Sequence, residues 1–173
     1  MHDRRRTANL LGATALAVHD LAMAGATGVA GVSASGAAAL VVLSASPEVG
    51  VTELGRRVGL SQSAAARMLD SLESRGLVAR RPGQGRSVAV TLTPAGRRTA
   101  AELLAARGAP LADLVDTLDD DQHEALAELL ATLLARLYGE VGSAELLCRL
   151  CDRGACTRDA VCPVGQAERE GAP

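Results

Sequence analysis

The fold of this chain is decided by residues 51–78, which read VTELGRRVGLSQSAAARMLDSLESRGLV. Thr52 is a residue type that caps helices, so we expect it to begin a short helix that ends at Gly59. Ser61 should cap a second helix over residues 61–74. Two helices joined by so tight a turn form a helix-turn-helix, whose second helix is the element that enters the major groove of DNA.

The second of these helices is amphipathic. Four apolar residues recur at the spacing of one helical face and are expected in the core: Ala65, Met68, Leu69 and Leu72. The other face carries small and polar residues that suit close approach to a groove and bonding to bases or phosphates: Ser61, Gln62, Ser63, Ala66 and Arg67. A solvated helix face has a similar composition, so this helix does not decide the function alone.

Two short β-prone runs follow, residues 77–81 and 87–92, with the flexible basic turn PGQGR between them at residues 82–86. A basic hairpin after a helix-turn-helix is the arrangement of a winged helix, whose wing can lie along a minor groove. We therefore predict DNA contacts from three arginines: Arg80, Arg81 and Arg86. The alternative is a surface hairpin whose arginines touch only water.

The charge of the chain is uneven, although its net value is only −2. All 18 basic residues are arginine; nine of them fall within residues 36–100, against four acidic residues there. Residues 101–140 carry nine acidic residues and two arginines. One basic segment on an acidic body favours a nucleic-acid partner. The single aromatic residue, Tyr138, argues against proteins that stack single-stranded bases on aromatic platforms.

Beyond the hairpin, the pattern is helical. Thr93 and Pro94 form the cap-then-proline pair that opens a helix, and a run of three aspartates at 119–121 opens another. Leucines recur at helical spacing in the last of these helices and are expected to form core and dimer seam: Leu126, Leu129, Leu130, Leu133, Leu134 and Leu137. The predicted fold class is mainly α with a small β-hairpin wing.

The N-terminus imitates a signal peptide, with arginines at 4–6, an apolar run over 10–18 and an Ala-Met-Ala sequence at 22–24. His19 and Asp20 interrupt the apolar run, so we favour an amphipathic helix and predict no transmembrane segment.

Several runs together resemble the MarR family of transcriptional regulators: VTEL at 51–54, LSQS at 60–63, LDSLESRGLV at 69–78 and VTLTPAG at 90–96. The resemblance covers most of residues 8–138. It implies a homodimeric winged-helix repressor that binds double-stranded DNA, with Gln62, Ser63 and Arg67 on the recognition helix and Arg86 in the wing. The family's wing tip usually reads Asp-Arg-Arg, whereas residues 84–86 here read Gln-Gly-Arg, so one arginine serves where two are usual.

We accordingly divide the chain into an N-terminal dimerisation helix (1–35), a winged helix-turn-helix (36–97), C-terminal dimerisation helices (98–140) and a cysteine-rich tail (141–173). The expected partners are double-stranded DNA, a second copy of the chain and a small-molecule effector, with no membrane; the expected location is the cytoplasm, on the nucleoid. No Gly-rich phosphate loop, nucleophile elbow or metalloprotease motif occurs, which argues against an enzyme.

All four cysteines lie in the tail, with the spacing C-x2-C-x4-C-x5-C: Cys148, Cys151, Cys156 and Cys162. Ser143 should cap a helix that reaches Cys151, and Gly154 should let the chain turn so that the four thiols converge. Four convergent thiolates are the ligand set of a tetrahedral zinc site, which we favour. An iron–sulfur cluster or a thiol switch, acting as a metal or redox sensor, is the alternative. Beyond Val164 we expect a frayed, polar end.

Overall fold

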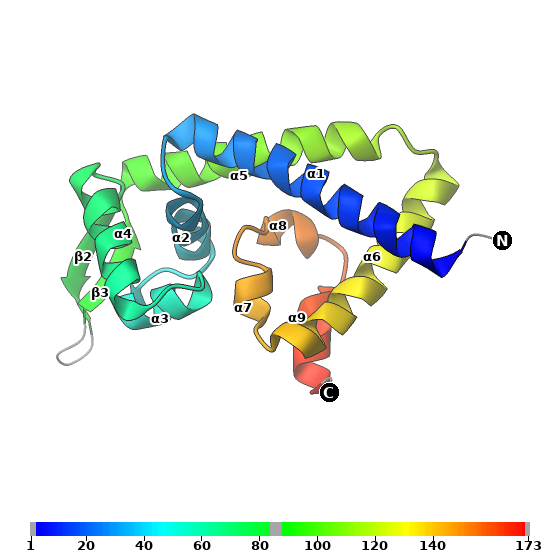
Figure 1. Cartoon of the computed structure of the whole chain (residues 1–173). Helices are drawn as coiled ribbons and strands as arrows, with labels where there is room; N and C mark the ends of the chain where they lie inside the picture. Colours follow the sequence, from blue (N-terminus) through cyan, green and yellow to red (C-terminus); the bar gives the residue numbers. More distant parts are fainter. Residues whose placement is uncertain (1–2, 84–87, 172–173) are drawn as a thin grey trace.

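Two long helices, α1 (Arg4–Ala30) and α5 (Pro94–Val115), lie side by side along the length of the molecule (Figure 1). This computed structural model describes residues 3–83 and 88–171. The winged helix stands at one end of the pair, and α6 (Asp120–Val141) runs back from the other end. The predicted fold class, mainly helical with a small β wing, is confirmed.

The winged helix is built from three helices and a small antiparallel sheet. Its elements are α2 (Ala34–Ala45), β1 (Val49–Gly50), α3 (Val51–Arg57), α4 (Gln62–Ser74), β2 (Val78–Pro82) and β3 (Val88–Leu92). β2 and β3 form the predicted hairpin, in a register that pairs Val78 with Leu92 and Pro82 with Val88. The sequence analysis missed β1, which adds to the other edge of β3 and pairs Val49 with Val90.

Most of the predicted helix starts are confirmed, because the cap side chain accepts a hydrogen bond from a backbone N–H in the first turn. Ser61 accepts from the backbone N–H of Ala64 at the start of α4, and Thr93 does the same for Gly96 at the start of α5. The prediction that Thr52 caps α3 is wrong. Gly50 holds that position, two residues earlier than expected, and it has no side chain with which to cap the helix.

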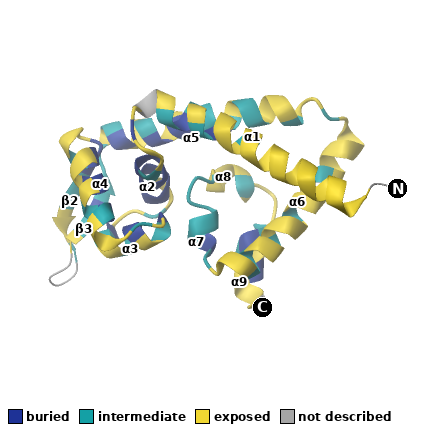
Figure 2. Ribbon diagram, in the orientation of Figure 1, coloured by how far each residue is buried: buried dark blue, intermediate teal, exposed yellow. Residues whose placement is uncertain are grey.

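The four predicted core residues of α4 are all buried, with Leu69 fully enclosed. They pack against α2, which is buried along residues 36–43, and against Leu54 of α3 (Figure 2). Gly55 lets α3 approach α4 closely, because an added Cβ would lie 2.8 Å from the Cβ of Ala65. The angle between the two helices is thus fixed by close packing.

Arg4–Gly28 in α1 is long and apolar enough to cross a bilayer by length and composition alone, a test that core helices and N-terminal signal sequences also pass. The expectation of no transmembrane segment therefore stays a prediction. The C-terminal part of α1 packs on α5, and Ala22 and Ala26 are buried. Its N-terminal part is exposed (Figure 2).

Helix α6 carries an exposed apolar face. Asp119 begins it with a reciprocal pair of hydrogen bonds to Gln122, as its aspartate run predicted. None of its residues is buried, and six apolar side chains are at least 37% exposed: Leu129, Leu130, Leu133, Leu134, Leu137 and Val141. A 22-residue helix with that pattern has an unfilled packing surface.

The C-terminal segment, residues 142–171, folds back toward the winged helix (Figure 1). It contains α7 (Ala144–Leu147), α8 (Arg153–Cys156) and α9 (Pro163–Glu170). Ser143 caps α7 as predicted, but the helix ends at Leu147 rather than at Cys151. Gly154 lies inside α8, so the prediction that it makes the turn is also wrong; Asp159 has the left-handed backbone there.

The frayed end predicted beyond Val164 is likewise a helix. α9 packs against α6 and buries Val164 and Ala167. The polar composition of this stretch gave no sign of the packing. Two apolar side chains on one face are enough to anchor so short a helix.

Candidate nucleic-acid interface

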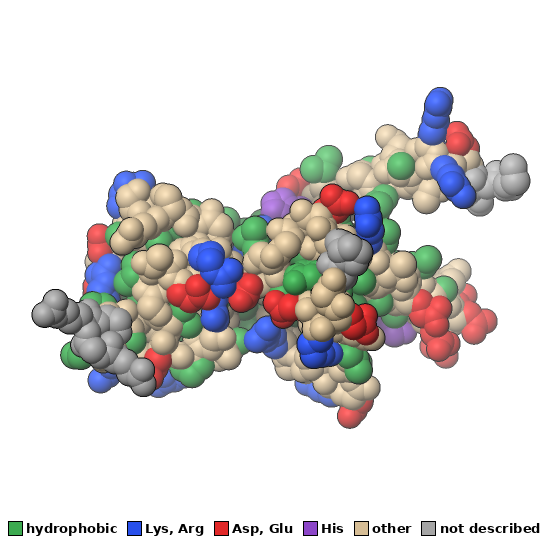
Figure 3. All heavy atoms as spheres, turned by 90° about the horizontal axis from the view of Figure 1, so that it is seen from below, with side chains coloured by type: hydrophobic (Ala, Val, Ile, Leu, Met, Phe, Trp, Pro, Cys, Tyr) green, Lys and Arg blue, Asp and Glu red, His purple; other side chains and the backbone are tan. Residues whose placement is uncertain are grey.

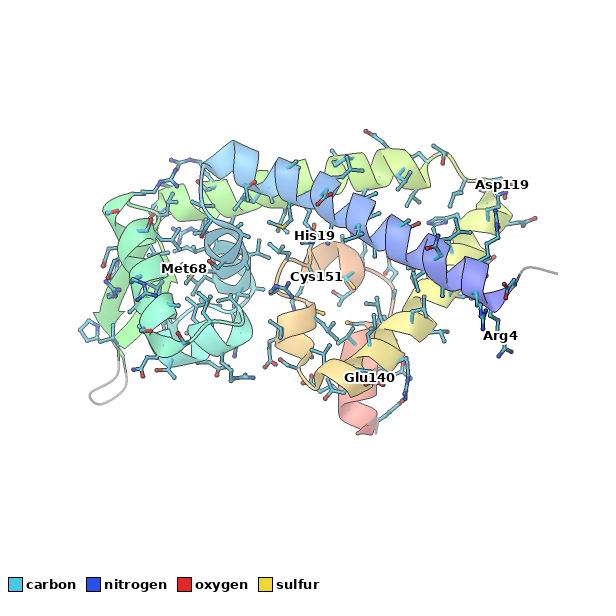
Figure 4. All side chains as sticks on the ribbon, viewed as in Figure 1. Arg4, His19, Met68, Asp119, Glu140 and Cys151 are labelled. Atoms are coloured by element: carbon cyan, nitrogen blue, oxygen red, sulfur yellow. The ribbon has the colours of Figure 1, made fainter. Side chains whose placement is uncertain are left out.

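The exposed face of α4 carries the residues predicted to read DNA. Gln62, Ser63 and Arg67 are exposed and Ala66 is half-buried, while Met68 points into the core behind them (Figure 4). Gln62 and Ser63 belong to the first turn of α4, so small side chains and backbone N–H groups stand at its leading end. That end of a helix-turn-helix contacts base edges.

Ser61 has a structural task at this position. Its hydroxyl accepts from the Ala64 N–H at 3.4 Å and lies 3.3 Å from the Ser63 hydroxyl. Both serines are exposed, so they remain open to a phosphate oxygen while fixing the start of α4.

Arg67 differs from its neighbouring arginines because it is exposed and makes no hydrogen bond or ion pair with any described residue. Arg56 and Arg57 bind Glu53, and both donate hydrogen bonds that lower the pKa of Glu53 to about 2. Arg97 donates to the Leu92 carbonyl oxygen at 2.9 Å. The guanidinium of Arg67 is thus available for a partner outside the chain.

Arg80, which we predicted to contact DNA, is paired with two acidic side chains of the same chain. Its guanidinium binds Asp70 at 2.7 Å and also forms an ion pair with Glu73, and its backbone N–H donates to Glu73 at 3.2 Å. The hydrogen bond that Arg80 donates to Asp70 and the nearby charge of Glu73 raise the pKa of Arg80. Arg80 therefore ties β2 to α4 and orients the wing relative to the recognition helix.

Of the other two wing arginines, Arg81 is exposed at the end of β2 and has no bonding partner among the described residues. Arg86 lies outside the described residues. Acidic side chains gather at the end of the molecule opposite the winged helix (Figure 3), in agreement with the charge division in the sequence.

The four cysteines of the C-terminal segment form a cluster, which we call the cysteine cluster: Cys148, Cys151, Cys156 and Cys162. All four are free, half-buried thiols that line the same cavity of about 400 Å³. Each thiol interacts with the next one along the chain, from Cys148 to Cys162. Among residues 3–83 and 88–171, however, no three cysteine, histidine or carboxylate side chains are grouped as metal ligands.

The thiols perturb one another. A hydrogen bond from Cys151 lowers the pKa of Cys148, and the same contact together with burial raises the pKa of Cys151. Burial raises the pKa of Cys156 to about 11, with contributions from Cys151 and Cys162. The sulfur of Cys162 accepts from the Gly165 N–H at 3.4 Å, where it caps α9.

Comparison with known proteins supports the same reading of the fold. Residues 32–85 match the family model of the MarR family. A MarR family protein from Bacillus stearothermophilus has a similar structure, with 22% identity and a TM-score of 0.68, over 79% of this chain and 99% of that one. No protein of curated function matches the chain in sequence.

Two structures of the MarR family protein Rv2887 from Mycobacterium tuberculosis are also similar. The complex with DNA has 26% identity and a TM-score of 0.59, over 73% of this chain and 95% of that one. The complex with salicylic acid has 28% identity and a TM-score of 0.55, over 72% of this chain and 93% of that one.

The recognition helix, wing and long flanking helices together define a winged helix-turn-helix protein. Within that class, residues 32–85 match the MarR family model, the family that the sequence runs resemble. The cysteine-containing segment lies outside the residues that match the family model, because the match ends at residue 85 and the cysteines begin at Cys148.

Proposed function

We propose that this protein is a homodimeric transcriptional repressor that binds specific double-stranded DNA in the cytoplasm, and that it is not an enzyme. The observation that carries the proposal is the exposed guanidinium of Arg67 on the recognition face of α4, which has no partner among residues 3–83 and 88–171. A free arginine fork on that face suits the O6 and N7 atoms of guanine or a backbone phosphate. The complex of Rv2887 with DNA supports the same role for this fold.

The proposed partner in the dimer is a second copy of the chain. Exposed leucines lie on two helices. They include Leu133 and Leu137 on α6, and Leu10 and Leu11 on the N-terminal half of α1. The N-terminal half of α1 and the leucine face of α6 have little to pack on within one chain, and a two-fold partner supplies the same apolar surface in return. A dimer also presents two α4 helices to successive major grooves.

A small-molecule effector has room beside the dimerisation helices. A cavity of about 460 Å³ lies between α1, α5 and the C-terminal segment, and it is lined by His19, Arg107, Leu111 and Cys151 among others (Figure 4). Apolar walls with a few convergent polar groups are typical of ligand sites. The salicylic acid complex of Rv2887 supports an effector of modest size for this fold.

The cysteine cluster gives the regulator a metal site, for which zinc is the proposed occupant. Four thiols around one cavity favour this assignment. A metal or redox sensor, based on an iron–sulfur cluster or a thiol switch, is the second candidate function, and the lowered pKa of Cys148 favours it over a protein without any cysteine chemistry.

Binding to duplexes selected from a random library, measured by fluorescence anisotropy at fixed salt, tests the proposed function. Arg67→Ala should weaken binding to the selected duplex by about 1–3 kcal/mol and relax the base preference at one position. The matched control is Arg136→Ala on α6, where the arginine is 72% exposed and should not matter for DNA. Equal affinities for Arg67→Ala and the unchanged protein would remove α4 from the interface.

A further inference from the structure

The C-terminal segment has too little apolar burial to hold its own shape. Between residues 142 and 171, all of which the structure describes, the buried apolar side chains are Ala144, Val164 and Ala167. Two of its helices have four residues each. A segment of about 30 residues usually needs disulfides, a metal or a large docking surface to stay folded. Its cysteines are free thiols, so a metal is the cross-link that the residues can supply.

The cysteine cluster brings its sulfur atoms from three short pieces of chain. Cys148 directly follows α7, Cys156 is the last residue of α8, and Cys162 directly precedes α9. Cys151 follows the turn after α7. All four line the same cavity. Each thiol can rotate about its Cα–Cβ bond, and zinc binding requires the four sulfur atoms to turn from a series of neighbours to one common point.

Two basic side chains lie near the cysteine cluster. Arg153 is near Cys148, and Arg107 of α5 is near Cys151. The first turn of α9 supplies a backbone N–H group to the sulfur of Cys162. Thiolate is the form in which cysteine binds zinc.

The same segment touches the helix-turn-helix directly. Glu145 of α7 forms an ion pair with Arg56 of α3 at 3.2 Å. Leu146 packs on Gly59, where an added Cβ would lie 3.1 Å from its Cδ1 atom. Gly59 lies in the turn that joins α3 to α4, and its φ of +74° is a conformation that side chains disfavour. The C-terminal segment therefore braces the turn that sets the position of the recognition helix.

We infer that the cysteine cluster binds one zinc ion per chain, and that this ion holds the C-terminal segment against the α3–α4 turn so that DNA affinity depends on zinc. The dependence on DNA rests on the proposed function; the zinc site does not. Zinc binding replaces thiol protons with the metal, since each thiol that ligates zinc releases its proton to solvent. No oxidation state changes.

Metal analysis of the full-length protein tests the site. We expect close to one zinc per chain, retained by Thr157→Ala, a control in the same segment whose hydroxyl donates to the Arg153 carbonyl oxygen. Cys156→Ser should lose the zinc, whereas Cys156→His should keep it, because histidine replaces cysteine in Cys₃His sites. Protein that stays free of zinc when supplied with it, or that contains iron with labile sulfide or disulfide bonds instead, overturns the inference.

DNA affinity measured with and without zinc tests the coupling. Removal of zinc by a chelator should weaken binding of the selected duplex about tenfold, and addition of zinc should restore it. The double variant Glu145→Gln/Leu146→Ala should still bind zinc, but its DNA affinity should no longer respond to the metal. A response equal to that of the unchanged protein overturns the coupling through α3. Loss of DNA binding in all zinc states, with the zinc content intact, points to failure of the proposed function instead.

Discussion

The exposed leucine face of α6 makes a quantitative prediction about the dimer. Leu130 and Leu137 are seven residues apart on one face, and they are 46% and 48% exposed in the single chain. Full burial of a leucine contributes about 2 kcal/mol, so each of these side chains has about 1 kcal/mol left to gain. A two-fold dimer buries each position twice, which makes about 4 kcal/mol for the pair.

The double variant Leu130→Ala/Leu137→Ala keeps one methyl group at each position and should lose most of that contribution. We expect a loss of about 3 kcal/mol, which corresponds to a dimer dissociation constant about 100-fold higher. Sedimentation over a dilution series measures this constant, and circular dichroism checks that α6 stays helical.

Thr132→Ala on the same helix is the control, because its hydroxyl bonds only to the Glu128 carbonyl oxygen and it lies off the leucine face. A dissociation constant for the double variant within a factor of about two of the control would refute the reasoning. So would an unchanged protein that is monomeric at the lowest concentrations at which it binds DNA.

Two further predictions concern the ion pairs of the winged helix. Arg80→Ala should lower the stability to urea unfolding by about 1 kcal/mol, because it removes ties from β2 to both Asp70 and Glu73; a loss no larger than that of an exposed helical ion pair would show that this brace is unimportant. The pKa of Glu53 is lowered to about 2, so the contribution of its ion pairs is fully present above its ordinary pKa of 4.5 and is lost as the pH falls from there toward 2. Glu53→Gln should therefore flatten the fall in urea stability over that range, by well under about 1 kcal/mol because the side chain is partly exposed; an identical pH profile would contradict the assignment.

Local signals in the sequence predicted the parts of the fold that depend on neighbours in the chain. The caps at Ser61, Thr93 and Asp119 satisfy backbone N–H groups three residues ahead, so residue type alone identifies them. The spacing of the apolar residues of α4 predicted its buried face for the same reason: helical geometry is regular.

Features that depend on contacts between distant parts of the chain were not predicted. β1 has only two residues, and its pairing with β3 depends on a contact some forty residues away in sequence that leaves no periodic pattern. Arg80 was predicted to face DNA because only its charge was considered, whereas Glu73 lies seven residues earlier, across the turn from α4 to β2. Acidic residues near such a turn are a signal that could have identified the brace.

The C-terminal segment shows a third kind of limit. Its cysteine spacing predicted four convergent thiols, and all four line one cavity, but the turn falls at Asp159 and not at Gly154. Helices as short as α7 and α8 are set by their surroundings more than by residue preference. Packing of α9 on α6 could not be read from two apolar residues in a polar stretch.

The central claim is that two copies of this chain bind one specific duplex through paired α4 helices. Light scattering of the purified complex with a selected duplex measures this directly through the mass of the complex. The account predicts two chains per duplex, with the complex lost when the bases of one half-site are scrambled. A complex of one chain per duplex, or one that survives scrambling of both half-sites at the same salt concentration, would contradict it.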